Sequence, residues 1–402
     1  MRRSDLSGPV RDRLTKLPEP YSAHYDVVPL PPPEEPVRLA SALPTLRAAS
    51  TALARVSTLA DELGDPFIVS RVLPRREAVS SSAIEGTNST LDELLQVEEG
   101  CGAATDAARQ VRDYATILDA LLPRARQQGH GFFQPAVVEE LHRAVMKSDT
   151  AYQDKPGALR ETVVWIGGRG DISQSTYNPT PPANIAASLA ENMTYLRCEG
   201  MQGVNQHLIA RMAIGHAHFE AVHPFRDGNG RVGRLLLPLM MAAEGHVPLY
   251  LSPYIEAYRA DYYAALKSAQ QQLDWNAVIG FVAKAVSGTV NELMATRDAL
   301  TQLRRAWQER GKFRRDSAAS NALDVVPHYP VLTINRLGQV LGVSFPAARS
   351  AINRLTSLGI LEEKTGYRRN RIFVSPEVLA IINRPFGEAP SLPGDLDDAQ
   401  DQ

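Results

Sequence analysis

Cysteine is scarce in this sequence: Cys101 and Cys198 are the two thiols among 402 residues. Two thiols can form neither a disulfide framework nor a zinc site, and such low usage is typical of proteins from a reducing compartment. We expect both cysteines to be small core residues and the protein to be cytoplasmic.

A strong charge of one sign and long apolar runs are missing as well. The formal net charge is −2, which argues against a globally basic protein that binds nucleic acid. The longest apolar stretch, residues 235–243, is too short to span a membrane, and no apolar run follows Met1. We therefore expect a soluble protein with no membrane partner. Its 44% hydrophobic content is enough for two or three domains with their own cores.

One stretch, residues 223–234, holds most of the candidate chemistry and reads His-Pro-Phe-Arg-Asp-Gly-Asn-Gly-Arg-Val-Gly-Arg. Before it, apolar residues on one side of a 3.6-residue period predict a helix over residues 205–222, which Pro224 ends. After it, residues 235–243 predict a second, buried helix that bends at Pro238. The stretch is therefore expected to be a loop that closes on the N-terminus of the second helix.

That position favours an anion, because the first N–H groups of a helix lack internal partners and the helix dipole is positive there. Gly228 and Gly230 allow the backbone to approach a phosphate without a Cβ in the way. Arg231 and Arg234 are three residues apart on the opening turn, so both can reach phosphate oxygens.

Two further side chains complete a set suited to phosphoryl transfer. Asp227 offers a hard oxygen ligand for a Mg²⁺ that bridges two phosphates, and His223 can take a proton near neutral pH. The alternative is that Asp-Gly-Asn-Gly is a surface turn and the arginines form a solvated face. The number of fixed positions favours the catalytic interpretation.

The whole stretch resembles the Fic signature, His-x-Phe-x-Asp/Glu-Gly-Asn-Gly-Arg-x-x-Arg, and matches it at every fixed position. Fic domains are all-helical enzymes that mostly transfer AMP from ATP to a hydroxyl side chain of a target protein. Related Doc-type kinases have a lysine in place of the second glycine, so Gly230 favours nucleotidyl transfer over phosphorylation. The resemblance implies a base (His223), a Mg²⁺ ligand (Asp227), an α-phosphate cradle (Gly228, Asn229, Gly230) and contacts to the outer phosphates (Arg231, Arg234).

A second motif precedes this core. Ser81 and Glu85 are four residues apart on a predicted helix, and Gly86 is a candidate C-cap. By itself the segment reads as an ordinary helix end. Beside a Fic signature it resembles the inhibitory motif of that family, Ser/Thr-x-x-x-Glu-Gly/Asn, whose glutamate pairs with the second signature arginine. The resemblance implies an intramolecular inhibitor in which Glu85 opposes Arg234.

A β-hairpin interrupts the predicted helices. Residues 162–166 are β-branched and aromatic, and the glycine-rich residues 167–170 predict a turn. In the family it resembles, a hairpin at this place is the flap that covers the nucleotide and holds the target by strand pairing. The resemblance thus assigns Ile166, Gly167 and Gly168 to the nucleotide site; a purely structural hairpin is the alternative.

Tyrosines recur after the signature at four-residue spacing. Tyr254 and Tyr258 are expected to be core residues. The group Asp261-Tyr262-Tyr263 resembles the family segment whose tyrosine packs on the base, which assigns Tyr262 to the nucleotide. Gln270 falls where some relatives have an adenine-contacting amide. His142 lies among apolar residues and is expected to be a satisfied core residue rather than a ligand.

Residues 333–374 predict a compact C-terminal unit of two helices, residues 333–341 and 346–358, followed by a hairpin. This order resembles a winged helix, a DNA-binding fold. Several arginines on its second helix and hairpin could contact phosphates, although acidic residues lie nearby. A dimerisation or target-docking module is the alternative. The predicted core is Leu337, Val340, Leu341, Ile352, Leu355 and Leu358, and the candidate DNA contacts are Arg349, Arg354, Arg368, Arg369 and Arg371.

These features divide the chain into four expected parts. They are an N-terminal arm with a helical region and the inhibitory helix (1–104), a Fic catalytic core (105–312), a winged-helix domain (313–390) and an acidic tail (391–402). Proline-rich residues 1–36 should form an extended arm without regular structure. Further helices are expected at residues 37–63, 67–85, 91–99, 104–126, 135–146, 184–197 and 275–310.

We expect a mainly α protein that uses ATP and Mg²⁺ to transfer AMP to a target protein or to itself and is inhibited by Glu85. The target should dock on the flap, and a homodimer is possible. The alternatives are an enzyme that removes AMP, with Glu85 acting on a water, and a regulator that binds DNA through residues 333–374.

Overall fold

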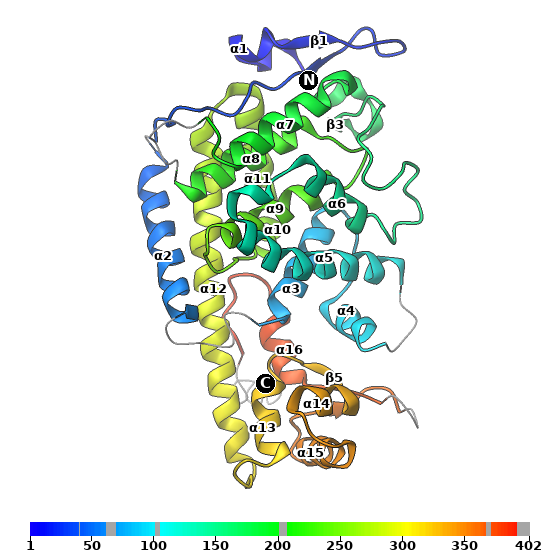
Figure 1. Cartoon of the computed structure of the whole chain (residues 1–402), viewed down its shortest axis with the longest axis vertical. Helices are drawn as coiled ribbons and strands as arrows, with labels where there is room; N and C mark the ends of the chain where they lie inside the picture. The colour runs from blue at the N-terminus through cyan, green and yellow to red at the C-terminus, as the bar shows by residue number, and fades with distance from the viewer. Residues whose placement is uncertain (40, 62–69, 101–104, 201–206, 367–370, 392–402) are drawn as a thin grey trace, which may run out of the picture.

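The computed structural model describes residues 1–39, 41–61, 70–100, 105–200, 207–366 and 371–391. The molecule is elongated, with the N-terminal arm at one end and the C-terminal helices and strands at the other (Figure 1). Helix α12 (Trp275–Glu309) joins the two ends and is roughly 50 Å long at 1.5 Å per residue. The described chain is mainly α, as predicted.

The centre of the larger half of the molecule, residues 41–309 where described, is helix α8 (Leu208–Val222), whose residues are all buried. A helix buried on every side needs no polar face, which is why its pattern is less one-sided than we expected. It packs against α7 (Ile185–Leu196), α9 (Asn229–Ala243), α11 (Arg259–Gln272) and α12. α9 begins at Asn229 rather than near residue 235, so Arg231 and Arg234 lie in its first two turns.

The helices around this centre begin and end within a few residues of the predictions. Side-chain caps fix several starts, among them a capping box between Thr90 and Glu93. α2 begins at residue 43 rather than 37, and predicted residues 62–69 lie outside the described chain. The remaining helices of this half are α2 (Leu43–Asp61), α3 (Val72–Ile84), α4 (Leu91–Glu98), α5 (Asp106–Gln128), α6 (Pro135–Val145) and α10 (Ser252–Ala257), with short 3₁₀ turns at Arg3–Asp5, Gly129–Phe132, Gly168–Gly170, Ile172–Gln174 and Pro182–Asn184.

Helix α12 is the one described helix whose length and mean hydropathy would suit a membrane span. In the structure, 56% of its apolar window is buried inside the protein, where it packs against α2, α8 and α11. Its apolar composition is explained by these contacts.

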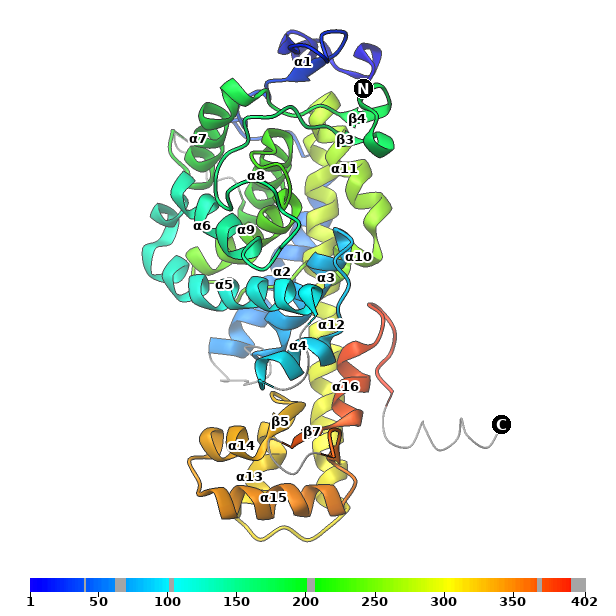
Figure 2. The same cartoon turned by 90° about the vertical axis from the view of Figure 1, so that its right-hand side faces the viewer.

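The N-terminal arm is more regular than predicted. It contains a short helix α1 (Gly8–Arg11) and an antiparallel pair of strands, β1 (Leu14–Lys16) and β2 (Tyr25–Val27). Apolar residues of the arm pack against Tyr177 and Ala221 and are buried there, which stabilises the arm in spite of its prolines. Figure 2 shows that the arm and the flap hairpin lie at the same end of the molecule.

The flap hairpin is shorter than predicted and begins later. Its strands are β3 (Ile166–Gly167) and β4 (Ser175–Tyr177), paired antiparallel with a register irregularity at β3. Residues 162–165 are not a strand. Gly167 and Gly168 have positive φ angles, and a Cβ on Gly168 would lie 2.9 Å from the Ser175 nitrogen. The glycines we assigned to a turn therefore also bring the two strands together.

The C-terminal unit contains both predicted helices, α14 (Ile334–Leu341) and α15 (Phe345–Ser357). The predicted hairpin is present as β6 (Glu362–Glu363) and β7 (Ile372–Val374), and β5 (Val331–Thr333) completes a sheet of order β5-β7-β6. Helices α13 (Ala318–Val325) and α16 (Pro376–Asn383), together with β5, were not predicted. Its assignment to the winged-helix class stays a prediction.

Most of the predicted core of this unit is buried. Leu337, Ile352 and Leu355 are fully buried, but Val340 is 40% exposed, so its assignment to the core was wrong. Val340 follows Gln339, which is also exposed, so both lie on the solvent side of α14. The unit contacts the larger half of the molecule at α4, where Arg336 lies 2.8 Å from Glu99.

Candidate active site

His223 lies where α8 ends, in the left-handed region with a φ of 51°. This backbone turn is uncommon for a residue with a Cβ, and it turns the side chain out of the helix. The imidazole is 20% exposed, and its Nδ1 is buried, so Nε2 is the nitrogen that a substrate can reach. Burial lowers the pKa of His223 to about 4, which keeps the ring neutral at pH 7.

The loop after His223 is held by two side chains. The Asn229 amide bonds both backbone groups of Phe225, with Nδ2 donating to the carbonyl at 2.8 Å and Oδ1 accepting from the N–H at 2.9 Å. His142 stacks on the Phe225 ring, with 3.7 Å between ring centroids. Its Nδ1 accepts from Gly157 N–H, so its Nε2 donates to the Asp227 carbonyl at 3.0 Å. His142 is thus the satisfied core residue that we predicted.

Asp227 projects from the loop, and its side chain is 63% exposed. One carboxylate oxygen accepts the Gly228 N–H at 2.6 Å, while Oδ2 lies 4.0 Å from Arg231. Among the described residues no group of three His, Cys, Asp or Glu side chains could hold a metal by itself. A single exposed carboxylate fits a Mg²⁺ that takes its other ligands from phosphates and water.

The amides that follow Asp227 form the start of α9. Gly228 is its N-cap, with a φ of 79°, and a Cβ there would lie 2.8 Å from the Met146 sulfur. Gly230 has a different constraint, because a Cβ there would clash with the Glu85 carboxylate and approach Arg234 at 2.9 Å. Both glycines therefore keep the cradle open, as an approaching phosphate would require.

The two signature arginines are buried below this cradle. Arg231 contacts the Met146 sulfur at 3.3 Å and Gln110 at 3.4 Å. Arg234 donates to Ser81 twice, to Oγ at 2.9 Å and to the backbone carbonyl at 2.8 Å. Two buried guanidinium groups beside a helix N-terminus make this the most electropositive part of the loop.

Glu85 balances that charge. It lies 2.8 Å from the Arg234 guanidinium, and Gly86 follows with a φ of 86°, which ends α3. Burial favours protonation of Glu85, but the charge of Arg234 outweighs this and holds its pKa below the ordinary value. The structure thus brings Ser81, Glu85 and Arg234 into one network, in which Ser81 and Arg234 are buried and the Glu85 side chain is 29% exposed.

Arg160, which the sequence did not single out, connects the flap to this site. Its guanidinium donates to four carbonyl groups, including His223 at 2.8 Å and Thr162 at 2.9 Å, and also those of Thr180 and Val222. It is buried, and burial lowers its pKa to about 10. Arg160 therefore fixes the backbone of His223 against the base of the flap. A lone arginine among loop residues gave no signal of this role.

Glu220 is a second residue that sequence reasoning missed. It is buried one turn before His223, and its Oε2 lies 3.8 Å from the His223 Nδ1. Its Oε1 has no hydrogen-bond partner among the described atoms. Burial raises the pKa of Glu220 to about 8 in spite of nearby Arg234, so a neutral carboxyl lies behind the imidazole at pH 7.

Tyr262 and Gln270, which the resemblance assigned to the nucleotide base, lie in two different surroundings. Tyr262 is buried and its hydroxyl lies 2.7 Å from His216, while the neighbouring Tyr263 is exposed. Gln270 lines a small cavity with residues of the N-terminal arm. The helix breaks between α10 and α11 at Tyr258, which is 45% exposed rather than in the core. The expected stripe of tyrosines is therefore not continuous.

Comparison with known proteins is consistent with this geometry. Residues 43–120 match the "Fic/DOC family N-terminal" model and residues 132–241 the "Fic/DOC family" model. The chain is 35% identical over 145 residues to protein adenylyltransferase fic-1 of Caenorhabditis briggsae, which covers 36% of this chain and 25% of that protein. It is 29% identical over 165 residues to protein adenylyltransferase Fic of Drosophila grimshawi, covering 41% of this chain and 31% of that protein.

The chain thus spans about a quarter to a third of the length of these curated relatives. A crystal structure of a Fic family protein from Desulfovibrio desulfuricans G20 resembles the fold with a TM-score of 0.52 at 23% identity. The match covers 86% of this chain and 98% of that chain. It shows that the helical arrangement is the Fic fold.

Proposed function

This chain carries the N-terminal and core domains of the Fic/DOC family, and from that premise we propose that it transfers AMP from ATP to a hydroxyl side chain of a protein. The observation that supports this most directly is the arrangement of one loop. His223, Asp227, the amides of Gly228 and Gly230, and Arg234 lie together at the start of α9.

In the proposed reaction His223 Nε2 accepts the proton of the target hydroxyl. The hydroxyl oxygen attacks the α-phosphorus, a new P–O bond forms, and the bond to the β-phosphate breaks, so that pyrophosphate leaves. The neutral imidazole is ready to accept a proton at pH 7, because burial holds its pKa at about 4. The helix N-terminus and the buried arginines stabilise the charge that develops on the phosphates.

Asp227 would hold Mg²⁺, which when bound would neutralise the charge of the leaving pyrophosphate. The exposed Oδ2 of Asp227 is the oxygen free to do so, since Oδ1 accepts the Gly228 N–H. Arg231 and Arg234 would bind the outer phosphates. The contact of Asn229 with the α-phosphate stays a prediction, since its amide already bonds Phe225.

Glu85 would keep this enzyme inhibited. Its carboxylate forms an ion pair with the Arg234 guanidinium at 2.8 Å. A γ-phosphate could then not bind Arg234 and would be repelled by the negative charge of Glu85. Gly230 provides the space for the carboxylate. Activation therefore requires α3, or at least its last turn, to move away from α9.

The target would bind along β3. The opposite strand is already occupied, because Gln271 donates to the Thr176 carbonyl at 2.8 Å and Val27 donates to that of Asn178 at 3.1 Å. This leaves β3 as the edge to which an extended peptide can add. Such pairing would place a target hydroxyl near His223 irrespective of the peptide sequence.

The deciding experiment compares ATP labelled on the α-phosphate with ATP labelled on the γ-phosphate, using the full chain with Glu85→Gly to relieve inhibition. Label from the α-phosphate should enter protein, and adding His223→Ala should reduce this by at least about a hundredfold. His130→Ala, at an exposed histidine far from the loop in sequence, is the matched control and should have no effect.

Mass spectrometry of the product identifies the transferred group and the acceptor residue together. Transfer of γ-label alone would replace the proposal by a kinase activity. Release of AMP from a modified protein, without transfer of α-label, would identify an enzyme that works in the reverse direction.

A further inference from the structure

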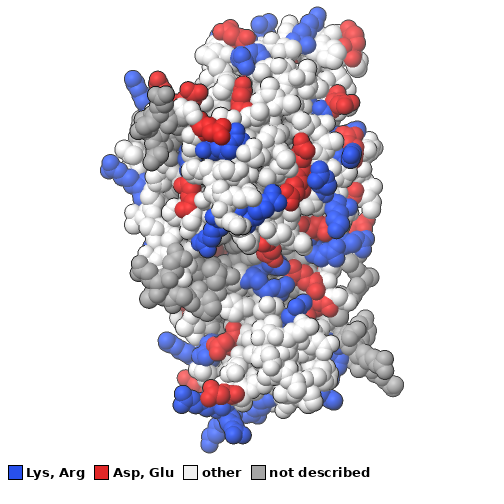
Figure 3. All heavy atoms as spheres, viewed as in Figure 1, with Lys and Arg blue, Asp and Glu red and all other residues white. Residues whose placement is uncertain are grey.

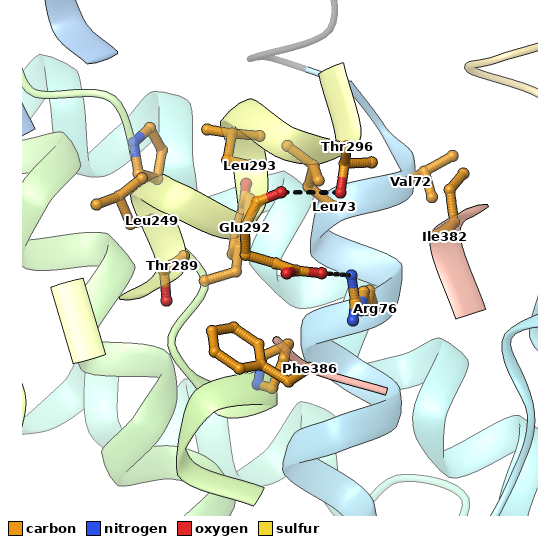
Figure 4. A pocket seen from close by; sticks show the side chains of 13 residues that line it. Val72, Leu73, Arg76, Leu249, Thr289, Glu292, Leu293, Thr296, Ile382 and Phe386 are labelled. Atoms are coloured by element: carbon orange, nitrogen blue, oxygen red, sulfur yellow. Dashed lines mark hydrogen bonds and ion pairs between the residues drawn. The ribbon is translucent and has the colours of Figure 1, made fainter. Parts of the chain in front are cut away.

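A cavity lies behind the inhibitory helix, away from the loop. Figure 4 shows its walls, which come from α3, the segment that leads into α10, α12, α16 and the segment after α16. Val72 and Leu73 on α3, Leu293 on α12 and Phe386 make most of the lining apolar. The cavity is therefore enclosed by the inhibitory helix and by the C-terminal unit together.

This inner chamber, of about 50 Å³, adjoins a larger outer chamber of about 550 Å³. The two share Arg76, Pro253, Ile382 and Phe386 as lining residues. The outer volume lies within the range of small-molecule sites. The inner chamber is mostly apolar, and the outer one carries more polar side chains, among them Asn383 and Arg384. The pair suits a molecule with one apolar and one polar end.

Charge at the junction indicates which polar group fits. Arg76 and Arg384 both approach the same oxygen of Glu292, at 3.2 and 2.8 Å. Two guanidinium groups therefore share one buried carboxylate. Glu388 also acts on Arg384, but it is exposed, and water screens its charge. Glu256 also lines the outer chamber, but it is only half-buried, and water screens its charge.

A hydroxyl in the inner chamber also lacks a partner. Thr289 is 9% exposed, and its Oγ1 has no hydrogen bond within the described structure. A buried hydroxyl without a partner is costly, and a bound molecule or water can satisfy it. This second observation indicates a ligand site independently of the arginines.

We propose that the two chambers bind a small carboxylate with a compact apolar group, such as a medium-chain fatty acid. The carboxylate lies against Arg76 and Arg384, and the apolar group fills the inner chamber beside Thr289. The energetic gain comes from burial of apolar surface and from charge-assisted hydrogen bonds to the guanidinium groups.

Occupancy would affect catalysis through α3, a consequence that rests on the proposed function. The helix that carries Val72, Leu73 and Arg76 continues to Ser81 and ends at Glu85, which holds Arg234. A molecule that binds this arrangement of α3 stabilises it relative to one in which Glu85 has moved away. By linkage the carboxylate and ATP should weaken each other's binding.

Calorimetry on the full chain with hexanoate, hexanol and hexylamine tests the site without any measurement of transfer. We expect one hexanoate per chain, bound at least about tenfold more tightly than hexanol, and no binding of hexylamine. Equal affinities for hexanoate and hexylamine would overturn the proposal, because the arginines would then have no role.

Thr289→Met, which fills the inner chamber, should weaken hexanoate at least about tenfold. Thr301→Met, at an exposed threonine on the same helix, is the matched control and should leave it unchanged. Arg76→Gln should also weaken hexanoate binding. Its control is Arg304→Gln, at an arginine of α12 that pairs with Asp324 and lines neither chamber. Affinity that persists in Thr289→Met would show that the ligand lies elsewhere.

Saturating hexanoate should reduce AMP transfer severalfold in the wild-type chain and leave the Glu85→Gly variant unaffected. Equal inhibition of both would disprove the coupling through α3. A chain that binds hexanoate as expected but transfers no AMP would support the site and refute the proposed function, so the two failures can be told apart.

Discussion

The loop at the start of α9 and the C-terminal unit are both rich in arginine, but the arginines of the two regions differ in burial. Arg231 and Arg234 are buried, and each has named partners. Arg349 and Arg354 on α15 are exposed, and Arg368 and Arg369 lie outside the described residues. Buried charge must be matched by specific groups, so its position indicates chemistry, whereas exposed charge is compatible with many functions.

The surface of the C-terminal unit reinforces this difference. Figure 3 shows a largely uncharged face over α14 and α15, with Lys and Arg gathered at the end of the molecule below it. Arg371, a candidate DNA contact, pairs with Glu363 instead. Phe345 is 52% exposed at the start of α15. DNA binding and protein docking therefore both remain proposals for this unit.

The largest effect should come from Arg160→Met, which tests whether burial in the loop region carries function. The variant leaves four carbonyl groups without their shared donor and loosens the backbone of His223. We expect AMP transfer to fall about a hundredfold and stability to fall by about 3 kcal/mol. Label transfer and urea unfolding measure these changes. Arg169→Met, at the exposed tip of the flap, is the control and should change neither quantity.

Glu220→Gln tests a buried neutral carboxyl in the same region. Above pH 4.5 an unfolded glutamate ionises, but folded Glu220 stays protonated up to about pH 8, so folding becomes less favourable as the pH rises. The variant should therefore be more stable than wild type by about 5 kcal/mol at pH 9, with the difference vanishing near pH 4. Urea unfolding across this range measures it. A difference independent of pH would contradict the raised pKa, and the exposed Glu309→Gln serves as control.

Glu85→Gly should raise self-modification about fivefold, equivalent to about 1 kcal/mol, because Arg234 becomes available to the γ-phosphate. Glu85→Gln keeps the shape and removes the charge, so it should give a smaller increase. The rate of α-label incorporation at saturating ATP measures both. The exposed Glu309→Gly, also at a helix end, should leave the rate unchanged. An unchanged rate in Glu85→Gly as well would mean that residues 81–86 are an ordinary helix end.

The smallest effect should come from the exposed arginines of the C-terminal unit. Arg349→Ala combined with Arg354→Ala should leave AMP transfer within about twofold of wild type. If the unit binds DNA, the same variant should weaken that binding by about tenfold at low salt and reduce its salt dependence by two phosphate contacts. Fluorescence anisotropy at stated salt concentrations measures this. A large loss of AMP transfer would contradict the distinction between the two regions, because exposed arginines of the C-terminal unit would then contribute to the activity.

The chemical groups of the loop could be predicted because they occur at fixed spacings within one short stretch. Residues 223–234 are consecutive, so the helix end, the glycines and the arginines have nearly fixed positions relative to one another. The helices were predictable for a similar reason, because caps and periodicity act over a few residues. The flap strands were predicted with wrong bounds, and the arm hairpin was not predicted. The pairing of short strands depends on contacts that no local pattern specifies.

The sequence by itself determined the mainly helical fold and the chemical groups of the loop, both of which depend on short spacings. The pairing of Glu85 with Arg234, which joins residues far apart in the chain, was implied only by the resemblance of residues 81–86 to the family's inhibitory motif. Only the tertiary structure decided that Arg160 holds His223, that a neutral Glu220 lies behind it, and that Arg76 and Arg384 share one carboxylate. The contacts of Arg160, Arg76 and Arg384 join residues far apart in the chain. Glu220 is only three residues from His223, but its neutral state depends on burial, which exists only once the chain has packed.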